Sequence, residues 1–344
     1  MKFNLSVQLY LVCKSKRLLE MVALKKTTII LLLLGICSTF YGGWGFFGHK
    51  KINRVAVFTI PDSELFQFYK KNIDYLTEHA VDPDKRRYAV KGEAEKHFID
   101  IDHYVEKGEN PFDVMPRRWN DAIEKFSEDT IKTYGISPWN IQLMLYKLTT
   151  AFKEKNLSRI LKYSAEIGHY ISDAHVPLHA TENYNGQFTN QKGIHGFWES
   201  RVPELFFQEY DLITGKAEYI NKPLETTWEF IQESYFAVDS VLSIEKEITE
   251  QWPDDRKYSF EKRGRVTMKV YSRDFSKEYS NRLNNMQERR LKASIKAVGS
   301  FWYTAWINAG QPNLNDLALN DAPINKEIEY KIDKNLKNKR QHSN

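Results

Sequence analysis

The chain has 344 residues, of which 42% are hydrophobic and 14% aromatic, and its formal net charge is +5 at pH 7. This length and apolar content suffice for one large core or two modest ones, which excludes a disordered chain. Because residues 1–43 hold six basic residues and one acidic residue, the rest of the chain is formally neutral. Neutrality argues against a protein that binds polynucleotides through a global positive field.

The first 43 residues are predicted to be a secretory signal. Lys25 and Lys26 precede the apolar run TTIILLLLGICSTF, and Gly42 and Gly43 offer a cleavage point directly before Trp44. Residues 1–20 are interpreted as an over-extended start of the chain, because Met21 stands where such a signal normally begins.

The alternative for this segment is an uncleaved membrane anchor, because the apolar run approaches the ~20 residues that a spanning helix needs. Polar Ser38 and Thr39 interrupt the run and favour cleavage. We therefore expect an exported protein, periplasmic or secreted. Both cysteines, Cys13 and Cys37, lie in the segment that would be removed, so the mature chain would contain no disulfide.

Beyond Trp44 the apolar residues recur at helical spacing. Helices are predicted to begin at Asp62–Ser63 and at Ser137–Pro138, to cover residues 161–174, and to run from 277 to 310. No useful run alternates with the period of a strand, and there is no internal repeat. The sequence therefore predicts one all-α, multi-helix domain over residues 44–312. Residues 313–344 are charged and poor in apolar residues, and are interpreted as a frayed tail.

Residues 169–179, HYISDAHVPLH, hold three of the nine histidines. His169 and Asp173 are four apart and share a helix face, which suits two ligands of one metal. Pro177 disfavours continuation of the helix, so a turn can bring His179 back. His195 and Glu199 repeat the four-residue spacing. One such pair is a common structural contact, whereas two pairs with a histidine between them indicate a metal site.

These residues resemble the zinc-dependent phospholipase C family and its relatives, the single-strand-specific zinc nucleases of the nuclease P-one type. Trp44 and His49 in WGFFGH match the opening motif, and Asp82 and His97 match the next ligand pair of the nuclease branch. The HxxxDxxxxxH core and the later pair complete the set, which consists of His169, Asp173, His179, His195 and Glu199. The resemblance covers residues 44–310 and implies an all-helical fold.

The resemblance also implies three zinc ions and their ligands. The first ion would be held by Asp82, His97, His169 and Asp173; the second by Asp173, His49 and the amine and carbonyl of Trp44; the third by His179, His195 and Glu199. Asp173 would then bridge two ions. The implied reaction is hydrolysis of a phosphodiester by a metal-bridging hydroxide, with in-line attack and no covalent intermediate.

Five further residues lie near the implied ligands in the sequence. Asp100 is predicted to act with Asp173 in catalysis by orienting a histidine or the attacking water, while surface acids are the alternative for the Asp100 and Asp102 pair. Arg86 and Arg87 are interpreted as solvated charges after a turn, with contact to phosphate as the alternative. His175 lies off the face of His169 and is interpreted as a packing or ligand-orienting residue.

The predicted substrate is a phosphodiester, either a phospholipid head group or single-stranded nucleic acid. Glu199 and the short interval between His179 and His195 favour a phospholipase, which is the favoured interpretation. The fifteen residues from Asp82 to His97 favour a nuclease. The alternative from another class is a zinc-binding surface protein without turnover. No obligate protein partner is evident, and a monomer is expected.

Overall fold

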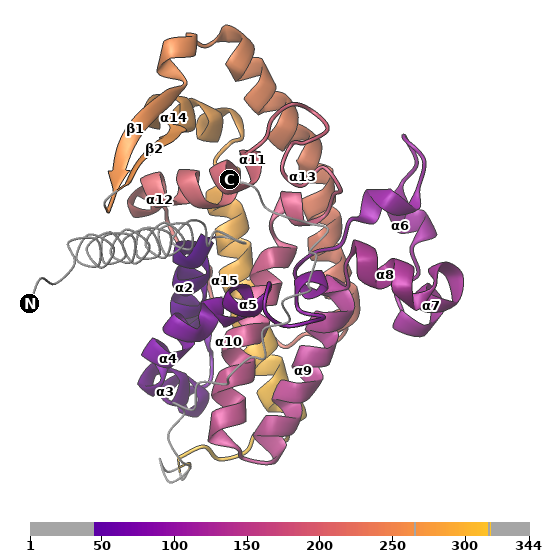
Figure 1. Ribbon diagram of the computed structural model, residues 1–344. Helices are drawn as coiled ribbons and strands as arrows, with labels where there is room; N and C mark the ends of the chain where they lie inside the picture. Colours follow the sequence, from indigo (N-terminus) through magenta and orange to yellow (C-terminus); the bar gives the residue numbers. More distant parts are fainter. Residues whose placement is uncertain (1–44, 265, 316, 318–344) are drawn as a thin grey trace, which may run out of the picture. The chain divides into compact units, whose positions relative to one another are not determined.

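Figure 1 shows the computed structural model, in which residues 45–264, 266–315 and 317 are described. The predicted signal, Trp44 and nearly all of the predicted tail lie outside these residues. Within them the α-helices are α2 (Gly45–Ala56), α3 (Ser63–Lys71), α4 (Ile73–Glu78), α5 (Asp82–Arg86), α6 (Pro111–Val114), α7 (Trp119–Phe126), α8 (Glu128–Tyr134), α9 (Ser137–Lys153), α10 (Leu157–Ala174), α11 (Ile194–Gly196), α12 (Val202–Phe206), α13 (Pro223–Gln251), α14 (Arg273–Arg282) and α15 (Met286–Asn308). In the described part of the chain, no helix is long and apolar enough to cross a membrane.

Helix α10 is surrounded by other helices. Every residue from Ser164 to Ala174 is buried, and α10 packs against α2, α9, α13 and α15. A helix that is buried on all sides is normally apolar throughout. The polar side chains of α10, which include His169 and Asp173, must therefore find polar partners or a ligand inside the protein.

Helices α2 and α10 approach each other closely at Gly168. A Cβ atom at this position would lie 2.1 Å from the side-chain oxygen of Asn53, so only glycine fits without a shift. Asn53 Nδ2 in turn donates hydrogen bonds to Ala165 O at 3.0 Å and Leu76 O at 3.2 Å. One turn before Asn53, the ring of His49 stacks on that of His169 with centroids 3.9 Å apart. The close approach thus places His49 directly against α10.

The predicted all-α class is confirmed, and the predicted helix starts agree with the structure. Asp62 accepts hydrogen bonds from the backbone N–H groups of Glu64 and Leu65 at the start of α3, and α9 begins at Ser137. The predicted helix from 277 to 310 is interrupted between α14 and α15, where Asn284 and Asn285 adopt φ of +53° and +51°. Asparagine is one of the few side chains that tolerate this left-handed conformation.

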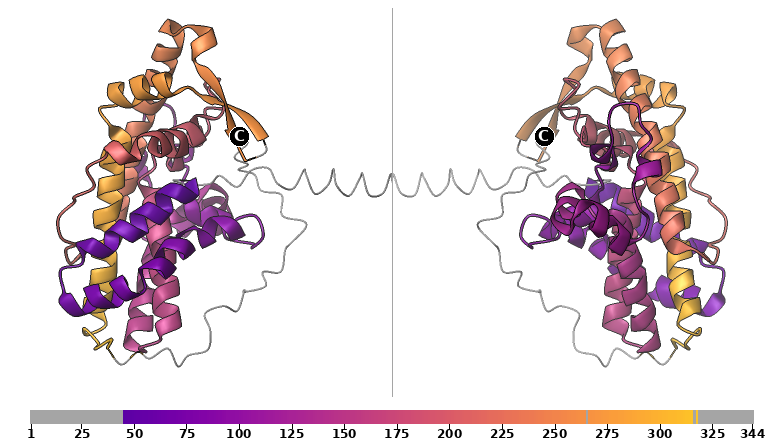
Figure 2. Two further views of the ribbon diagram at one scale, coloured as in Figure 1. Left: turned by 90° about the vertical axis from the view of Figure 1, so that its left-hand side faces the viewer. Right: turned by 90° about the vertical axis from the view of Figure 1, so that its right-hand side faces the viewer.

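The expectation of no strand is wrong for residues 258–271. Strands β1 (Tyr258–Arg263) and β2 (Val266–Tyr271) form an antiparallel hairpin in which Tyr258 pairs with Tyr271 and Arg263 with Val266. Figures 1 and 2 show this hairpin at the edge of the helical unit, near α14.

Candidate metal centre

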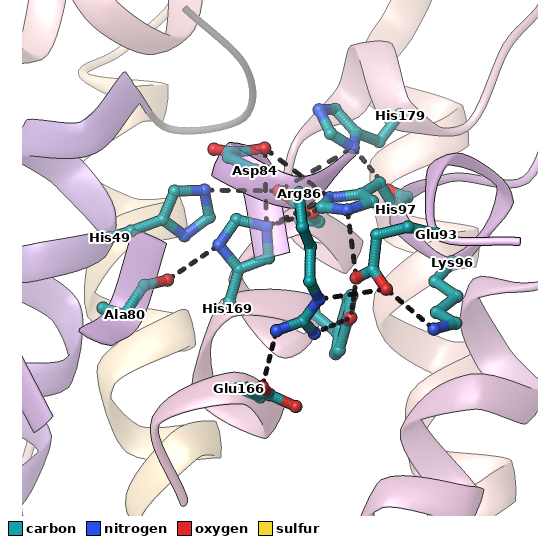
Figure 3. Close-up of polar contacts among 12 residues, drawn as sticks. His49, Ala80, Asp84, Arg86, Glu93, Lys96, His97, Glu166, His169 and His179 are labelled. Carbon is teal, nitrogen blue, oxygen red and sulfur yellow. Dashed lines mark hydrogen bonds and ion pairs between the residues drawn. The ribbon is translucent and has the colours of Figure 1, made fainter. Parts of the chain in front are cut away.

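The first group of metal-binding side chains gathers around α10 (Figure 3). Asp173 Oδ2 lies 2.9 Å from His97 Nδ1 and 3.2 Å from His169 Nε2, and Asp173 Oδ1 lies 3.4 Å from His49 Nε2. Asp84 Oδ1 is 3.7 Å from both His97 Nδ1 and His169 Nε2. All five side chains are buried. Two sets suited to a metal ion result: His49, His169 and Asp173; and Asp84, His97 and His169.

The second group joins the turn after α10 to a later helix. Pro177 begins a 3₁₀ turn that ends at His179, and this turn places His179 Nδ1 3.9 Å from Asp173 Oδ1. His195 lies on α11, and Glu199 lies in the π-helical turn Phe197–Arg201 that follows. Glu199 Oε2 is 3.0 Å from His195 Nε2 and 3.7 Å from His179 Nε2. These three buried residues form a third set suited to a metal ion.

Three histidines are oriented by backbone carbonyl groups. The Nδ1 atom of His169 lies 2.9 Å from Ala80 O, that of His179 lies 2.5 Å from His97 O, and that of His195 lies 2.9 Å from Tyr184 O. An imidazole that donates from Nδ1 to a carbonyl keeps its proton there and presents Nε2 with a free lone pair. In all three residues Nε2 is the atom that faces the acidic side chains of the two groups.

Two carboxylates of these groups, Asp84 and Glu199, lack hydrogen-bond partners among the described residues. All four of their side-chain oxygen atoms are buried. Burial raises the pKa of each carboxyl to about 7. Buried unpaired charge is costly unless a cation neutralises it. Nitrogen and carboxylate donors in sets of three are those that zinc takes, so the residues present fit this metal.

In the structure Asp84, and not the predicted Asp82, is the acid that lies beside His97. Asp82 begins α5, binds His79 Nδ1 at 2.5 Å and Lys85 Nζ at 2.9 Å, and its side chain is 27% exposed. Residues two apart lie about 200° apart around a helix, so only one of the two acids can face α10. The sequence offers both acids on either side of Pro83, and no local signal separates them.

We expect Asp84→Asn to lower phosphodiester hydrolysis by at least about 10- to 100-fold, the range that even outer contacts of metal ligands contribute. The replacement removes a buried negative charge from the set with His97 and His169, so zinc content should also fall. Asp82→Asn is the matched control and should change activity by less than about twofold, because a half-exposed ion pair contributes little. Equal losses in the two variants, measured by turnover and elemental analysis, would contradict this assignment.

Arg86 lies behind His97 in a buried ionic network. Its Nε atom is 3.1 Å from Glu93 Oε2, and its NH1 and NH2 atoms donate to Glu166 Oε1 at 2.6 Å and Tyr170 OH at 3.0 Å. Glu93 Oε1 also lies 3.8 Å from His97 Nε2. The network fixes the segment after α5 against α10, and thereby the positions of Asp84 and His97 (Figure 3).

Arg87 is the second of these arginines, and the interpretation of both as solvated charges is wrong. Arg86 is 7% exposed and Arg87 is 2% exposed. Unlike Arg86, Arg87 has no hydrogen-bond partner among the described residues for any guanidinium nitrogen. Burial has the largest effect on the pKa values of Asp84, His97 and Glu199. The positive charge of Arg87 is a further effect, and it lowers all three pKa values. A buried cation therefore lies close to both metal-binding groups.

Asp100, Asp102 and His175 lie outside the three sets suited to a metal ion. Asp100 is buried, but it belongs to none of the three sets, and its backbone N–H donates to Tyr134 O at 2.7 Å. Asp102 accepts hydrogen bonds from Thr181 Oγ1 at 2.6 Å and from the backbone N–H of Glu182 at 2.9 Å, so it fixes the chain after His179. His175 packs on Phe230 with ring centroids 4.3 Å apart, as expected of a packing residue.

The fold and the buried donor sets define an all-helical protein built around a metal centre. The chain matches the model of the zinc-dependent phospholipase C family over residues 48–262, a span that contains every described donor of the three sets. It belongs to that family. The resemblance inferred from the sequence is thereby confirmed.

Solved structures show a distant likeness to two bacterial toxins. The alpha-toxin of Clostridium perfringens, avian strain SWCP, is 12% identical over 79% of this chain and 65% of the toxin, with a TM-score of 0.42. The alpha toxin from Clostridium absonum is 12% identical over 83% of this chain and 67% of the toxin, with a TM-score of 0.40. The match thus spans about two thirds of each toxin chain. No curated protein matches this chain.

Proposed function

We propose that the chain is an exported, monomeric zinc-dependent hydrolase of phosphodiesters that acts on phospholipids as a phospholipase C. The observation that carries the proposal is the convergence of three buried sets of histidine and carboxylate donors, with unpaired charge in both groups. Family membership supports zinc as the metal and a phospholipid as the substrate. The proposed ligands are Trp44, His49, Asp84, His97, His169, Asp173, His179, His195 and Glu199, for about three ions.

When held by these residues, zinc would supply Lewis-acid chemistry that activates water near neutral pH and would neutralise charge that builds up on the phosphate. The chain's own residues supply the remaining functions. The carboxylate of Asp173 faces His49, His97 and His169 at once, so it is the proposed bridge. Arg87 is proposed to donate hydrogen bonds to phosphate oxygens, and Asp100 to orient the attacking water. The alternative of a single-strand-specific nuclease uses the same residues on another phosphodiester.

The fifteen-residue interval that favoured a nuclease no longer applies if Asp84 is the ligand, because Asp84 and His97 are thirteen apart. Paired assays on phosphatidylcholine and single-stranded DNA test the choice of substrate. We expect zinc-dependent hydrolysis of the phospholipid, with DNA turned over more slowly. Preferred cleavage of DNA would establish the nuclease instead. Stoichiometric zinc without turnover of either substrate would favour the surface protein.

We further expect elemental analysis of the mature protein to find about three zinc ions, and chelation to lower both activity and thermal stability. Metal that binds only the folded state stabilises it, so the melting temperature should rise again when zinc is restored. An active protein that contains one zinc ion or none would contradict the proposed trinuclear centre.

The proposed ligand Trp44 gives a separate prediction for processing of the chain. An α-amine has a pKa of about 7.7–8.0 and becomes a zinc donor on losing its proton, whereas an amide nitrogen is a poor donor. Protein that begins at Trp44 should therefore be active, and one added Met should remove one zinc ion and lower activity by at least about tenfold. Trp44→Phe, which keeps the amine, should be tolerated better. Full zinc content and normal turnover in the Met-extended protein would exclude the amine as a ligand.

A further inference from the structure

The hairpin of β1 and β2 has a fixed base. Arg201 Nε donates to Tyr271 O at 3.0 Å, and Arg201 NH1 donates to Glu261 Oε2 at 2.9 Å. The ring of Tyr271 stacks on Phe197 with centroids 3.8 Å apart. Phe197 and Arg201 are the two ends of the π-helical turn that carries Glu199. The hairpin is therefore attached to the segment that supplies a proposed ligand of the third zinc ion.

The other parts of the hairpin expose apolar and basic side chains together. Phe260 is 73% exposed, and Val266, which the strand register places on the opposite face beside the turn, is 61% exposed; both values are high for large apolar residues. Phe260 pairs with Lys269 across the hairpin, and both side chains are exposed on the same face. Lys262 follows on that face, because side chains two apart in a strand point the same way.

The net charge of the hairpin is positive. The segment 258–271, YSFEKRGRVTMKVY, contains four basic residues and one acidic residue. That acidic residue, Glu261, is bound to Arg201 and does not neutralise the lysines of the exposed face. A two-stranded hairpin alone is at best marginally stable in water, so this hairpin depends on its contacts with Arg201 and Phe197. Exposed apolar side chains next to lysines are suited to a docking surface.

We propose that this hairpin docks the protein on a phospholipid surface that contains anionic lipid. The inference rests on the proposed phospholipase function. Aromatic and aliphatic side chains enter the boundary between head groups and acyl chains, while nearby lysines are attracted to the negative surface potential. Because the base of the hairpin is tied to the segment with Glu199, docking holds that segment close to the lipid.

The open strand edges could instead pair with a second copy of the chain. Exposed lysines on the face of the hairpin oppose such pairing between identical copies, since their charges would be brought together. The lipid surface, which is negative, is the partner that complements this charge.

The test uses the mature protein, zinc-loaded, and sedimentation with vesicles of phosphatidylcholine containing about 20% phosphatidylserine. The double variant Phe260→Ser with Val266→Ser should bind these vesicles about tenfold more weakly. The double variant Lys262→Gln with Lys269→Gln should show a comparable loss and a weaker dependence on salt. Ile213→Ser is the matched control, because Ile213 is 83% exposed and lies outside the hairpin.

A soluble phosphodiester, bis(p-nitrophenyl) phosphate, separates docking from catalysis, and its turnover should be unchanged in both double variants. Unchanged vesicle binding by the double variants, or an equal loss in Ile213→Ser, would overturn the inference. A change of oligomeric state on light scattering that accounts for the loss would do the same. If the unmodified protein hydrolyses no phospholipid, the proposed function fails, whereas vesicle binding still reports on the hairpin.

Discussion

Asp173→Asn is expected to lower phosphodiester hydrolysis by more than about 10³-fold and to remove more zinc than any other single replacement, as expected for a charge that serves two metal ions. Asp173 is the one carboxylate that faces His49, His97 and His169 within 3.4 Å. Burial has the largest single effect and raises its pKa, but the charges of His169 and His179 and the hydrogen bonds from His169 and His49 together hold the pKa well below its ordinary value. The group is therefore ionised, and the neutral amide removes a charge that both ions of the proposed centre would share.

Glu199→Gln is the matched comparison for this prediction. Among the described histidines, Glu199 lies beside His179 and His195, so its replacement should remove about one zinc ion and leave the first group intact. Activity should fall less than in Asp173→Asn. Elemental analysis and turnover measurements on the two variants test this difference in zinc content and activity. Equal losses of zinc and activity would show that no bridge distinguishes Asp173, and a fully active Asp173→Asn protein would exclude its role altogether.

The parts of the centre that lie within one helix were predictable from spacing. His169 and Asp173 are one helical turn apart, as are His195 and Glu199, so local geometry brings each pair together whatever the rest of the fold does. His49 and His97 reach the centre through tertiary packing, and only the family resemblance placed them there. The close approach of α2 and α10 at Gly168 is the packing that brings His49 in.

The choice between Asp82 and Asp84 could not be made from local sequence. It depends on which side of the short helix α5 faces α10, and that orientation is fixed by Arg86, which binds Glu93 and Glu166. Those partners lie seven and eighty residues further along the chain. The hairpin was missed for a related reason. Its apolar alternation, Val266, Met268 and Val270, covers only one short strand, and its base is held by Arg201, sixty residues before Glu261.

Arg87 differs from Arg86 in that its buried guanidinium has no hydrogen-bond partner among the described residues. Arg86 satisfies its donors with Glu93, Glu166 and Tyr170. Leaving a charged donor group buried and unsatisfied destabilises a protein, unless a ligand completes the site. A phosphate group accepts hydrogen bonds from the planar fork of an arginine at two oxygens at once. The unsatisfied guanidinium of Arg87 is thus better explained by binding of the proposed phosphodiester than by a role in stabilising the fold.

Arg87→Gln is therefore expected to lower turnover by about 10³-fold, the scale of an arginine that stabilises charge during phosphoryl transfer. Its melting temperature without substrate should be unchanged or higher, because a buried guanidinium without hydrogen-bond partners among the described residues has been removed. Arg86→Gln is the control with the opposite signature, since it leaves buried Glu166 without the cation that it binds and Glu93 with Lys96 as its remaining cation, and it should cost about 3–5 kcal/mol of stability. Arg87→Lys should restore part of the activity, as it keeps the charge but not the fork. If Arg87→Gln is instead destabilised as much as Arg86→Gln and retains its turnover, Arg87 supports the fold and does not contact phosphate.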